Sequence, residues 1–132
     1  MADPILRKRL LRILEEDLYF GDLTTEILAR PVVVEAEVFP REECVLAGVR
    51  ESLELAEMFE VECEPLRRDG ERVKADETVL ELNGKEDSIL VLERSLLNIL
   101  SRMSGIATLT SRFAEEARLG NPDVKVAATR KT

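Results

Sequence analysis

A long run of apolar residues at helical spacing, in the C-terminal third, constrains this chain most. Between Asp87 and Gly120 the apolar side chains recur every three or four residues, at Ile89, Leu92, Leu96, Ile99, Leu100, Met103, Ile106, Leu109, Phe113 and Ala117. That spacing places them on one face of a helix. Ser104-Gly105 interrupts the stripe, and glycine is a poor helix former. The sequence therefore predicts two consecutive helices with a break or kink at this pair.

The preceding region has the pattern of short strands. Residues 32–39 alternate between small apolar side chains and glutamates, which predicts a half-buried strand. Further strands are predicted over 44–47, 61–66, 72–74 and 78–82, with turns at Asp69-Gly70 and Asn83-Gly84. Helices are predicted over 3–18, capped by Asp3, and over 49–59. The fold class is therefore α+β, a mainly antiparallel sheet with helices packed on it.

The last residues predict one more strand, over 123–128, where valines and alanines alternate with charged and small residues. Its C-terminal end carries Thr129-Arg130-Lys131-Thr132. A helix followed by a strand whose end is rich in polar groups is typical of the opening of an α/β barrel. We therefore expect an N-terminal sandwich domain with a linking helix over 1–105, and the truncated start of a barrel over 106–132. On this interpretation the chain is the N-terminal fragment of a longer protein.

Composition excludes several classes of function. The 132 residues carry 19 Lys and Arg against 27 Asp and Glu, a net charge of −8, which argues against a nucleic-acid coat protein. The histidine count of 0 excludes a Cys/His zinc site and a histidine general base. The sequence has neither a membrane-spanning apolar run nor a secretory signal pattern, so a cytoplasmic location is the default expectation. Cys44 and Cys63 form no CxxC pair and are interpreted as structural.

Two groups of cations are the candidate binding residues. Arg94 follows Glu93 within the apolar stripe, and it either pairs with Glu93 or Glu86 or projects into a site. Thr129, Arg130 and Lys131 offer hydroxyl, guanidinium and ammonium groups that suit a carboxylate or a phosphate. The alternative for this second group is an ordinary basic tail.

Two weaker candidates lie near the N-terminus. Asp17, Asp22, Thr24 and Glu26 carry oxygen ligands that suit a hard cation, although such residues are common in turns. The basic residues between Arg7 and Arg12 are favoured as the solvated face of a packed helix over an RNA-binding surface.

Several segments together resemble one family of enzymes, the quinolinate phosphoribosyltransferases. The segment 16–26, EDLYFGDLTTE, is similar to the family's opening EDL-x-x-GD-[IL]-TT, and ECVLAG at 43–48 to its GVLAG. Asp69-Gly70-Glu71-Arg72-Val73 resembles the DGD-x-V turn. The segment 93–108 resembles the helix motif that ends in SGIAT, and 128–132 resembles the strand end TRKT. These motifs occur in the family's order and span nearly the whole chain.

The resemblance implies a pentosyltransferase with an N-terminal sandwich domain and an incomplete α/β barrel, at least dimeric. It implies transfer of phosphoribose from phosphoribosyl pyrophosphate to quinolinate with Mg²⁺, giving nicotinate mononucleotide, pyrophosphate and CO₂ in NAD biosynthesis. By the same resemblance Arg130 would bind a quinolinate carboxylate, with Thr129 beside it, and Lys131 would contact substrate oxygens. Arg94 would reach into the neighbouring subunit's site. The family's remaining site residues fall beyond position 132, so the isolated chain is expected to be inactive.

Two alternatives stay open at this point. A molybdenum-transport-associated relative of the same superfamily shares the GDLTT and TRK signatures, and the motifs present here do not separate the two. A non-catalytic sandwich module that binds a protein or an anion needs nothing beyond residue 132.

Overall fold

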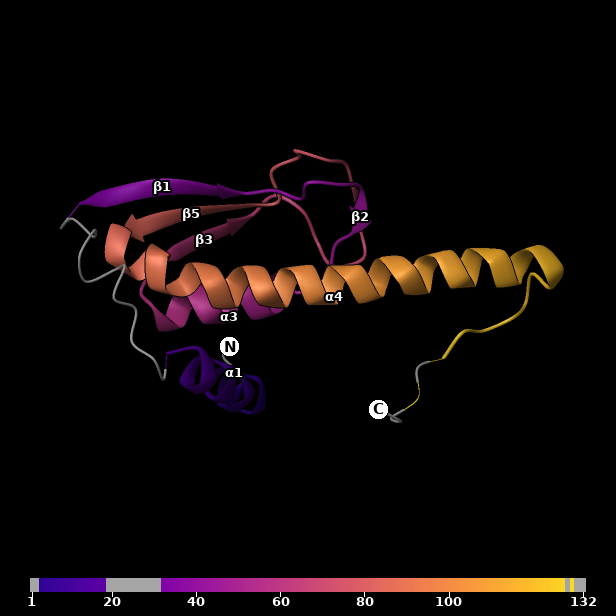
Figure 1. Ribbon diagram of the computed structural model, residues 1–132, viewed down its shortest axis with the longest axis horizontal. Helices are drawn as coiled ribbons and strands as arrows, with labels where there is room; N and C mark the ends of the chain where they lie inside the picture. Colours follow the sequence, from indigo (N-terminus) through magenta and orange to yellow (C-terminus); the bar gives the residue numbers. More distant parts are fainter. Residues whose placement is uncertain (1–2, 19–31, 128, 130–132) are drawn as a thin grey trace.

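The structure, a computed structural model, describes residues 3–18, 32–127 and 129, and it stacks them in three layers. The sheet forms one outer layer, two helices pack side by side beneath it, and the N-terminal helix lies under these helices (Figure 1). The elements are α1 Pro4–Leu18, β1 Val33–Val38, β2 Cys44–Val45, α3 Val49–Met58, β3 Glu62–Pro65, β4 Arg72–Val73, β5 Leu80–Lys85 and α4 Glu86–Gly120. The predicted α+β class, with helices on an antiparallel sheet, is confirmed.

The main sheet has the order β1-β5-β3, with both pairs antiparallel, and β2 pairs with β4 in a second small sheet. The alternation predicted for 32–39 is confirmed, because Val34, Ala36 and Val38 are half-buried while the glutamates between them are exposed. The predicted turn at Asn83-Gly84 is wrong, since β5 continues through both residues to Lys85. Gly84 serves close packing instead: a Cβ there would lie 3.2 Å from Cγ2 of Val61.

The core lies between the sheet and helices α3 and α4. Leu55 of α3, Leu80 of β5, and Leu92 and Leu96 of α4 are each at most 1% exposed. Helix α1 adds Leu10 and Leu14 to the same cluster. Within the described ranges, no helix is long and apolar enough to cross a membrane.

Helix α4 runs unbroken from Glu86 to Gly120, so the predicted break at Ser104-Gly105 is wrong (Figure 1). One internal glycine costs a helix only about 1 kcal/mol, and the buried stripe on either side outweighs that. Gly105 is exposed, with no atom within 4 Å of where its Cβ would be, so nothing forces the backbone to bend there. The helix passes through the predicted domain boundary at 105–106, which itself stays a prediction.

The strand predicted over 123–128 does not form in the described residues 123–127. Val126 is 47% exposed, and no described strand lies beside this segment to accept its backbone hydrogen bonds. Alternation of side chains creates a strand only where a partner edge exists. The alternation at 123–128 is present, but no strand among the described residues pairs with this segment.

The N-terminal helix begins as predicted. The carboxylate of Asp3 accepts hydrogen bonds from the backbone N–H groups of Leu6 and Ile5, which hold the pKa of Asp3 below its usual value. Asp3 also pairs with Arg50 of α3 at 2.8 Å, which ties the two helices together. Lys8, Arg9 and Arg12 of the basic stretch are exposed, as expected for the solvated face of a packed helix. Arg7 instead is half-buried and pairs with the nearly buried Glu54 of α3 at 3.8 Å.

The exposed face of the main sheet carries a row of like charges. Glu81 on the central strand β5 lies opposite Glu37 of β1 and Glu64 of β3, so three carboxylates stand side by side. We call Glu37, Glu81 and Glu64 the glutamate row. Like charges directly opposite one another destabilise a sheet.

Removing the central charge is expected to stabilise the protein. For Glu81→Gln we expect the free energy of unfolding to rise by about 0.5–1 kcal/mol at low salt, because two repulsive pairs are lost. In 1 M NaCl the gain should shrink, since the screening length falls to about 3 Å. Urea unfolding at both salt concentrations measures this.

The matched control is Glu62→Gln on the same sheet face. Glu62 lies opposite Asn83, which carries no charge, so this change should alter stability much less. Equal gains from the two substitutions, or a gain that survives 1 M NaCl unchanged, would contradict repulsion in the glutamate row.

Candidate functional site

Arg94 is an exposed cation on the face of α4 that points away from the core. Successive residues of a helix turn by about 100°, so Arg94 points opposite to the buried Leu92 and Leu96. Adjacent helix residues do not face each other, and Glu86 lies about 12 Å away along the helix axis. Within the described residues the Arg94 side chain makes neither an ion pair nor a hydrogen bond, so of the two alternatives pairing with Glu93 or Glu86 is not the one adopted. Its guanidinium is available to an external anion.

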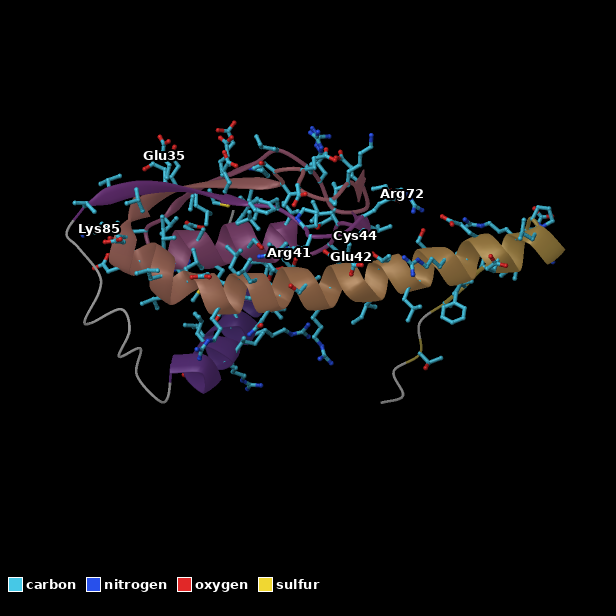
Figure 2. All side chains as sticks on the ribbon, turned by 45° about the horizontal axis from the view of Figure 1, so that its top comes forward. Glu35, Arg41, Glu42, Cys44, Arg72 and Lys85 are labelled. Carbon is cyan, nitrogen blue, oxygen red and sulfur yellow. The ribbon has the colours of Figure 1, made fainter. Side chains whose placement is uncertain are left out.

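A groove of about 570 Å³ lies one helical turn further along α4. One wall is α4, with Leu97 and Leu109 exposed; the other is the β1–β2 connection, which contributes Phe39. The groove also has two arginines, Arg41 from the connection and Arg112 from α4 (Figure 2 labels Arg41). Glu42 and Glu43 line it as well, so the groove combines apolar walls with two cations and two carboxylates.

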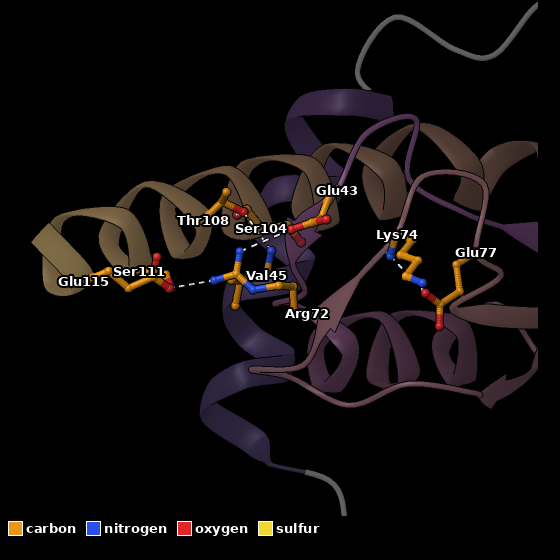
Figure 3. Close-up of polar contacts among 9 residues, drawn as sticks. All are labelled: Glu43, Val45, Arg72, Lys74, Glu77, Ser104, Thr108, Ser111 and Glu115. Atoms are coloured by element: carbon orange, nitrogen blue, oxygen red, sulfur yellow. Dashed lines mark hydrogen bonds and ion pairs between the residues drawn. The ribbon is translucent and has the colours of Figure 1, made fainter.

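Beside this groove, three of the sequence motifs meet at strand β2. The backbone N–H of Val45 donates to Thr108 Oγ1 at 2.9 Å (Figure 3). The backbone N–H of Ala47 donates to Ser104 Oγ at 3.0 Å. Ser104 Oγ in turn donates to the carbonyl of Ala47, and Thr108 Oγ1 donates to the carbonyl of Ser104. Each hydroxyl therefore gives its proton to a backbone carbonyl and accepts a backbone N–H, so neither has a proton left to donate to a ligand.

The Asp69-Gly70 turn approaches the same strand from the other side. Leu46 donates its N–H to the carbonyl of Glu71 and accepts from the N–H of Gly70, each at 2.8 Å. The carboxylate of Asp69 accepts from the N–H of Val49 at 2.9 Å and so caps α3. We call residues 45–49 and 69–71, together with Ser104 and Thr108, the β2 joint.

Gly48 allows the β2 joint to close onto α4. Its φ of +104° is a conformation that glycine adopts most readily. A Cβ at Gly48 would lie 3.3 Å from Sδ of Met103 and 3.4 Å from Cγ2 of Ile99. The VLAG motif thus ends in glycine because the backbone needs both this conformation and this close approach.

Arg72 extends the contact toward the far end of α4. Its guanidinium pairs with Glu115 of α4 at 2.7 Å and with Glu43, just before β2, at 3.3 Å (Figure 3). Ser111 Oγ donates to the same Glu115 carboxylate. Ser104, Thr108, Ser111 and Glu115 are spaced three or four residues apart, so they form one polar seam along α4.

Nucleophilic and metal chemistry find little support in the described residues. Burial raises the pKa of the Cys63 thiol to about 11, and burial together with Glu42 raises that of Cys44. Both cysteines are free and lie in strands, as predicted. Across residues 3–18, 32–127 and 129, no three His, Cys, Asp or Glu side chains are grouped to hold a metal ion.

Other predicted site residues fall outside the described part of the chain. They are Arg130 and Lys131, along with Asp22, Thr24 and Glu26 of the first motif. Thr129 is described and exposed. Asp17 belongs to α1, but its side chain is not described. Of the predicted cations, the structure therefore places Arg94 alone.

Sequence reasoning missed the hydroxyls of Ser104 and Thr108, the cap from Asp69 and the bridge from Arg72. Their four-residue spacing on an amphipathic helix puts Ser104 and Thr108 on one face, which was the available signal. The backbone partners on β2 are about 60 residues away in the chain, and nothing in the local pattern identifies them.

Comparison with known proteins places these features in a family. Residues 22–104 match the family model described as quinolinate phosphoribosyl transferase, N-terminal domain. A probable nicotinate-nucleotide pyrophosphorylase (carboxylating) from Archaeoglobus fulgidus is 50% identical over 114 residues, which cover 86% of this chain and 43% of the relative. One of the same name from Methanocaldococcus jannaschii is 39% identical over 126 residues, covering 95% and 44%.

Comparison with solved structures agrees with the family match. The crystal structure of NadC from Streptococcus pyogenes matches 100% of this chain and 48% of that chain, with a TM-score of 0.87 and 32% identity. The present chain thus spans less than half the length of the proteins it matches.

Proposed function

The chain belongs to the quinolinate phosphoribosyl transferase family, and from that premise we propose that it takes part in the reaction for which the family is named. Phosphoribose is transferred from phosphoribosyl pyrophosphate to the ring nitrogen of quinolinate, pyrophosphate leaves, and CO₂ is lost to give nicotinate mononucleotide for NAD synthesis. The observation that carries the proposal is the family match over residues 22–104. The named relatives favour it over a molybdenum-transport-associated protein or a non-catalytic module.

The chemistry of the substrates fits the cations of this chain. Quinolinate carries two carboxylates and phosphoribosyl pyrophosphate carries several phosphates, so binding needs guanidinium and ammonium groups more than an acid–base pair. We assign Arg130 to a quinolinate carboxylate, with Thr129 donating a hydrogen bond beside it and Lys131 contacting oxygens of the phosphoribosyl donor. Arg94, exposed and without an internal partner, supplies a second guanidinium.

The proposal includes a homo-oligomer, a dimer or larger, in which Arg94 serves the neighbouring subunit's site. Helix α4 supports this, because Ile106, Leu109 and Phe113 are 55–62% exposed on its second half. A contiguous apolar surface of this kind is typical of a face that packs against another surface. Neither a nucleic acid nor a membrane is among the proposed partners.

Magnesium and location are further expectations of the same proposal. Among the described residues, no three His, Cys, Asp or Glu side chains are grouped to hold a metal ion by themselves. We propose that Mg²⁺ enters with the phosphates of the donor, its usual route into such enzymes, and we derive no step through it. A cytoplasmic location agrees with the two free cysteines.

Calorimetric titration of quinolinate into the complete protein that carries this sequence tests the proposal. We expect binding, and we expect Arg130→Ala to weaken it about 10- to 100-fold, as for loss of a charged hydrogen-bond partner. Lys125→Ala, which removes an exposed nearby cation, is the matched control and should bind normally. No binding, or binding indifferent to Arg130, would favour the non-catalytic module.

A further inference from the structure

We propose that Ser104 and Thr108 are positioning residues that refine the rotation of α4, and with it the direction in which Arg94 points. The inference rests on the proposed function, because it assigns Arg94 to substrate. It gives the serine and threonine of the SGIAT motif a role other than contact with substrate.

The hydrogen bonds of the β2 joint restrain rotation of α4 about its own axis; we call this pair of bonds the lock. A hydrogen bond weakens steeply when its angle falls, so a pair of such bonds resists rotation of the helix that carries the acceptors. Here two hydroxyls of α4 each accept a hydrogen bond from a backbone N–H, one from Val45 of β2 and one from Ala47 just after it, at 2.9 and 3.0 Å. Rotating α4 by one residue, about 100°, would remove both hydroxyls from the β2 joint and bring Met103 and Ala107, or Gly105 and Leu109, to their places.

The lock is linked to Arg94 through the helix itself. Arg94 and Ser104 belong to the same unbroken helix and are separated by about 15 Å along its axis. Burial of Leu92 and Leu96 sets the overall rotation of α4. A continuous helix transmits rotation along its length, so the contacts of Ser104 and Thr108 refine the direction in which Arg94 points. The bridge from Arg72 to Glu115 lies on the same polar seam and restrains the helix beyond them.

Strand pairing and the Gly48 side of the joint add no directional contact to these bonds. Strand β2 is only two residues long and pairs with an equally short β4. Gly48 offers no side chain to hold α4 in place. The two hydroxyls are therefore the directional contacts between β2 and the middle of α4.

The test combines hydrogen exchange with kinetics in the complete protein that carries this sequence. In a Ser104→Ala/Thr108→Val variant we expect the amides of Val45 and Ala47 to exchange about tenfold faster. We expect the KM for quinolinate to rise about tenfold with a smaller change in kcat, because a misdirected Arg94 weakens substrate binding. The single variant Thr108→Ser keeps the hydroxyl, so its amide exchange rates and its KM should both match those of the unmodified protein.

Thr110→Val is the matched control. Thr110 is exposed, and its hydroxyl bonds only within α4, to the carbonyl of Ile106, so its loss should leave exchange at β2 and KM unchanged. The decisive comparison adds Ser104→Ala/Thr108→Val to Arg94→Ala. If the joint acts through Arg94, the double substitution should cause no further rise in KM in a protein that already carries Arg94→Ala.

The outcomes separate the two proposals. Effects on KM that add fully to those of Arg94→Ala would overturn the positioning role and leave the joint as a stability element. Unchanged exchange at Val45 and Ala47 would overturn the lock itself. Absence of turnover by the unmodified protein would overturn the proposed function and the role of Arg94 with it, while the exchange measurement would still decide whether the lock exists.

Discussion

Replacing Arg94 with alanine is expected to lower kcat/KM for quinolinate about 100-fold in the complete protein that carries this sequence. Removing one partner of a charged hydrogen-bonded pair costs about 3 kcal/mol, and each 1.36 kcal/mol is a factor of ten in rate. Folding should be unaffected, because the side chain is exposed and makes no contact that supports the described fold. Steady-state kinetics with quinolinate varied, together with thermal unfolding, measures both effects.

Arg102→Ala provides the matched control. Arg102 is exposed on the same helix and forms no ion pair within the described residues, so its removal tests whether any lost positive charge on α4 lowers activity. We expect its kcat/KM to stay within about twofold of the unmodified protein, since surface charges far from a site act weakly through screened solvent. A loss equal to that of Arg94→Ala would contradict a specific role for Arg94.

Mixing two impaired variants, assayed at a quinolinate concentration where each alone has little activity, tests whether Arg94 acts across subunits. In a mixed dimer of Arg94→Ala with Arg130→Ala, one site would combine the intact Arg130 of one chain with the intact Arg94 of the other. Random pairing should then restore about a quarter of full activity, because half the dimers are mixed and half their sites are intact. If Arg94 serves its own chain's site, mixing should restore nothing.

Local patterns in the sequence were sufficient to predict α1, β1 and the apolar stripe of α4. Asp3, the alternation at 32–39 and the helical spacing from Ile89 onward each act over a few residues, so the sequence alone reveals them. The break predicted at Gly105 failed because propensity at one residue was weighed without the buried stripe around it. The strand predicted over 123–128 failed because pairing requires a neighbour that alternation does not supply.

The candidate site was predictable in its residue types but not in its geometry. Charge and context singled out Arg94, yet its lack of an internal partner became clear only from the direction of α4 relative to the core. The family motifs at 43–48, 69–73 and 104–108 converge on β2 through hydrogen bonds between segments far apart in the chain. Motif spacing carries no information on such contacts, so it cannot distinguish a residue that binds substrate from one that holds the fold.

Truncating Leu92 is expected to have the largest effect on stability. Its side chain is fully buried in the core, on the face of α4 that packs against α3 and β5. For Leu92→Ala we expect the free energy of unfolding to fall by about 3–4 kcal/mol, the sum of lost burial and a cavity that the surrounding helices fill incompletely. That is a large part of the roughly 5–15 kcal/mol that stabilises a typical domain.

Leu97→Ala makes the same chemical change on the same helix at a side chain that is 38% exposed. It should cost about 1 kcal/mol or less, because less apolar surface returns to water and the groove leaves no closed cavity. Urea unfolding of both variants provides the comparison. Similar losses at the two positions would mean that α4 does not bury its Leu92 face as described, and the direction assigned to Arg94, on the opposite face, would be wrong with it.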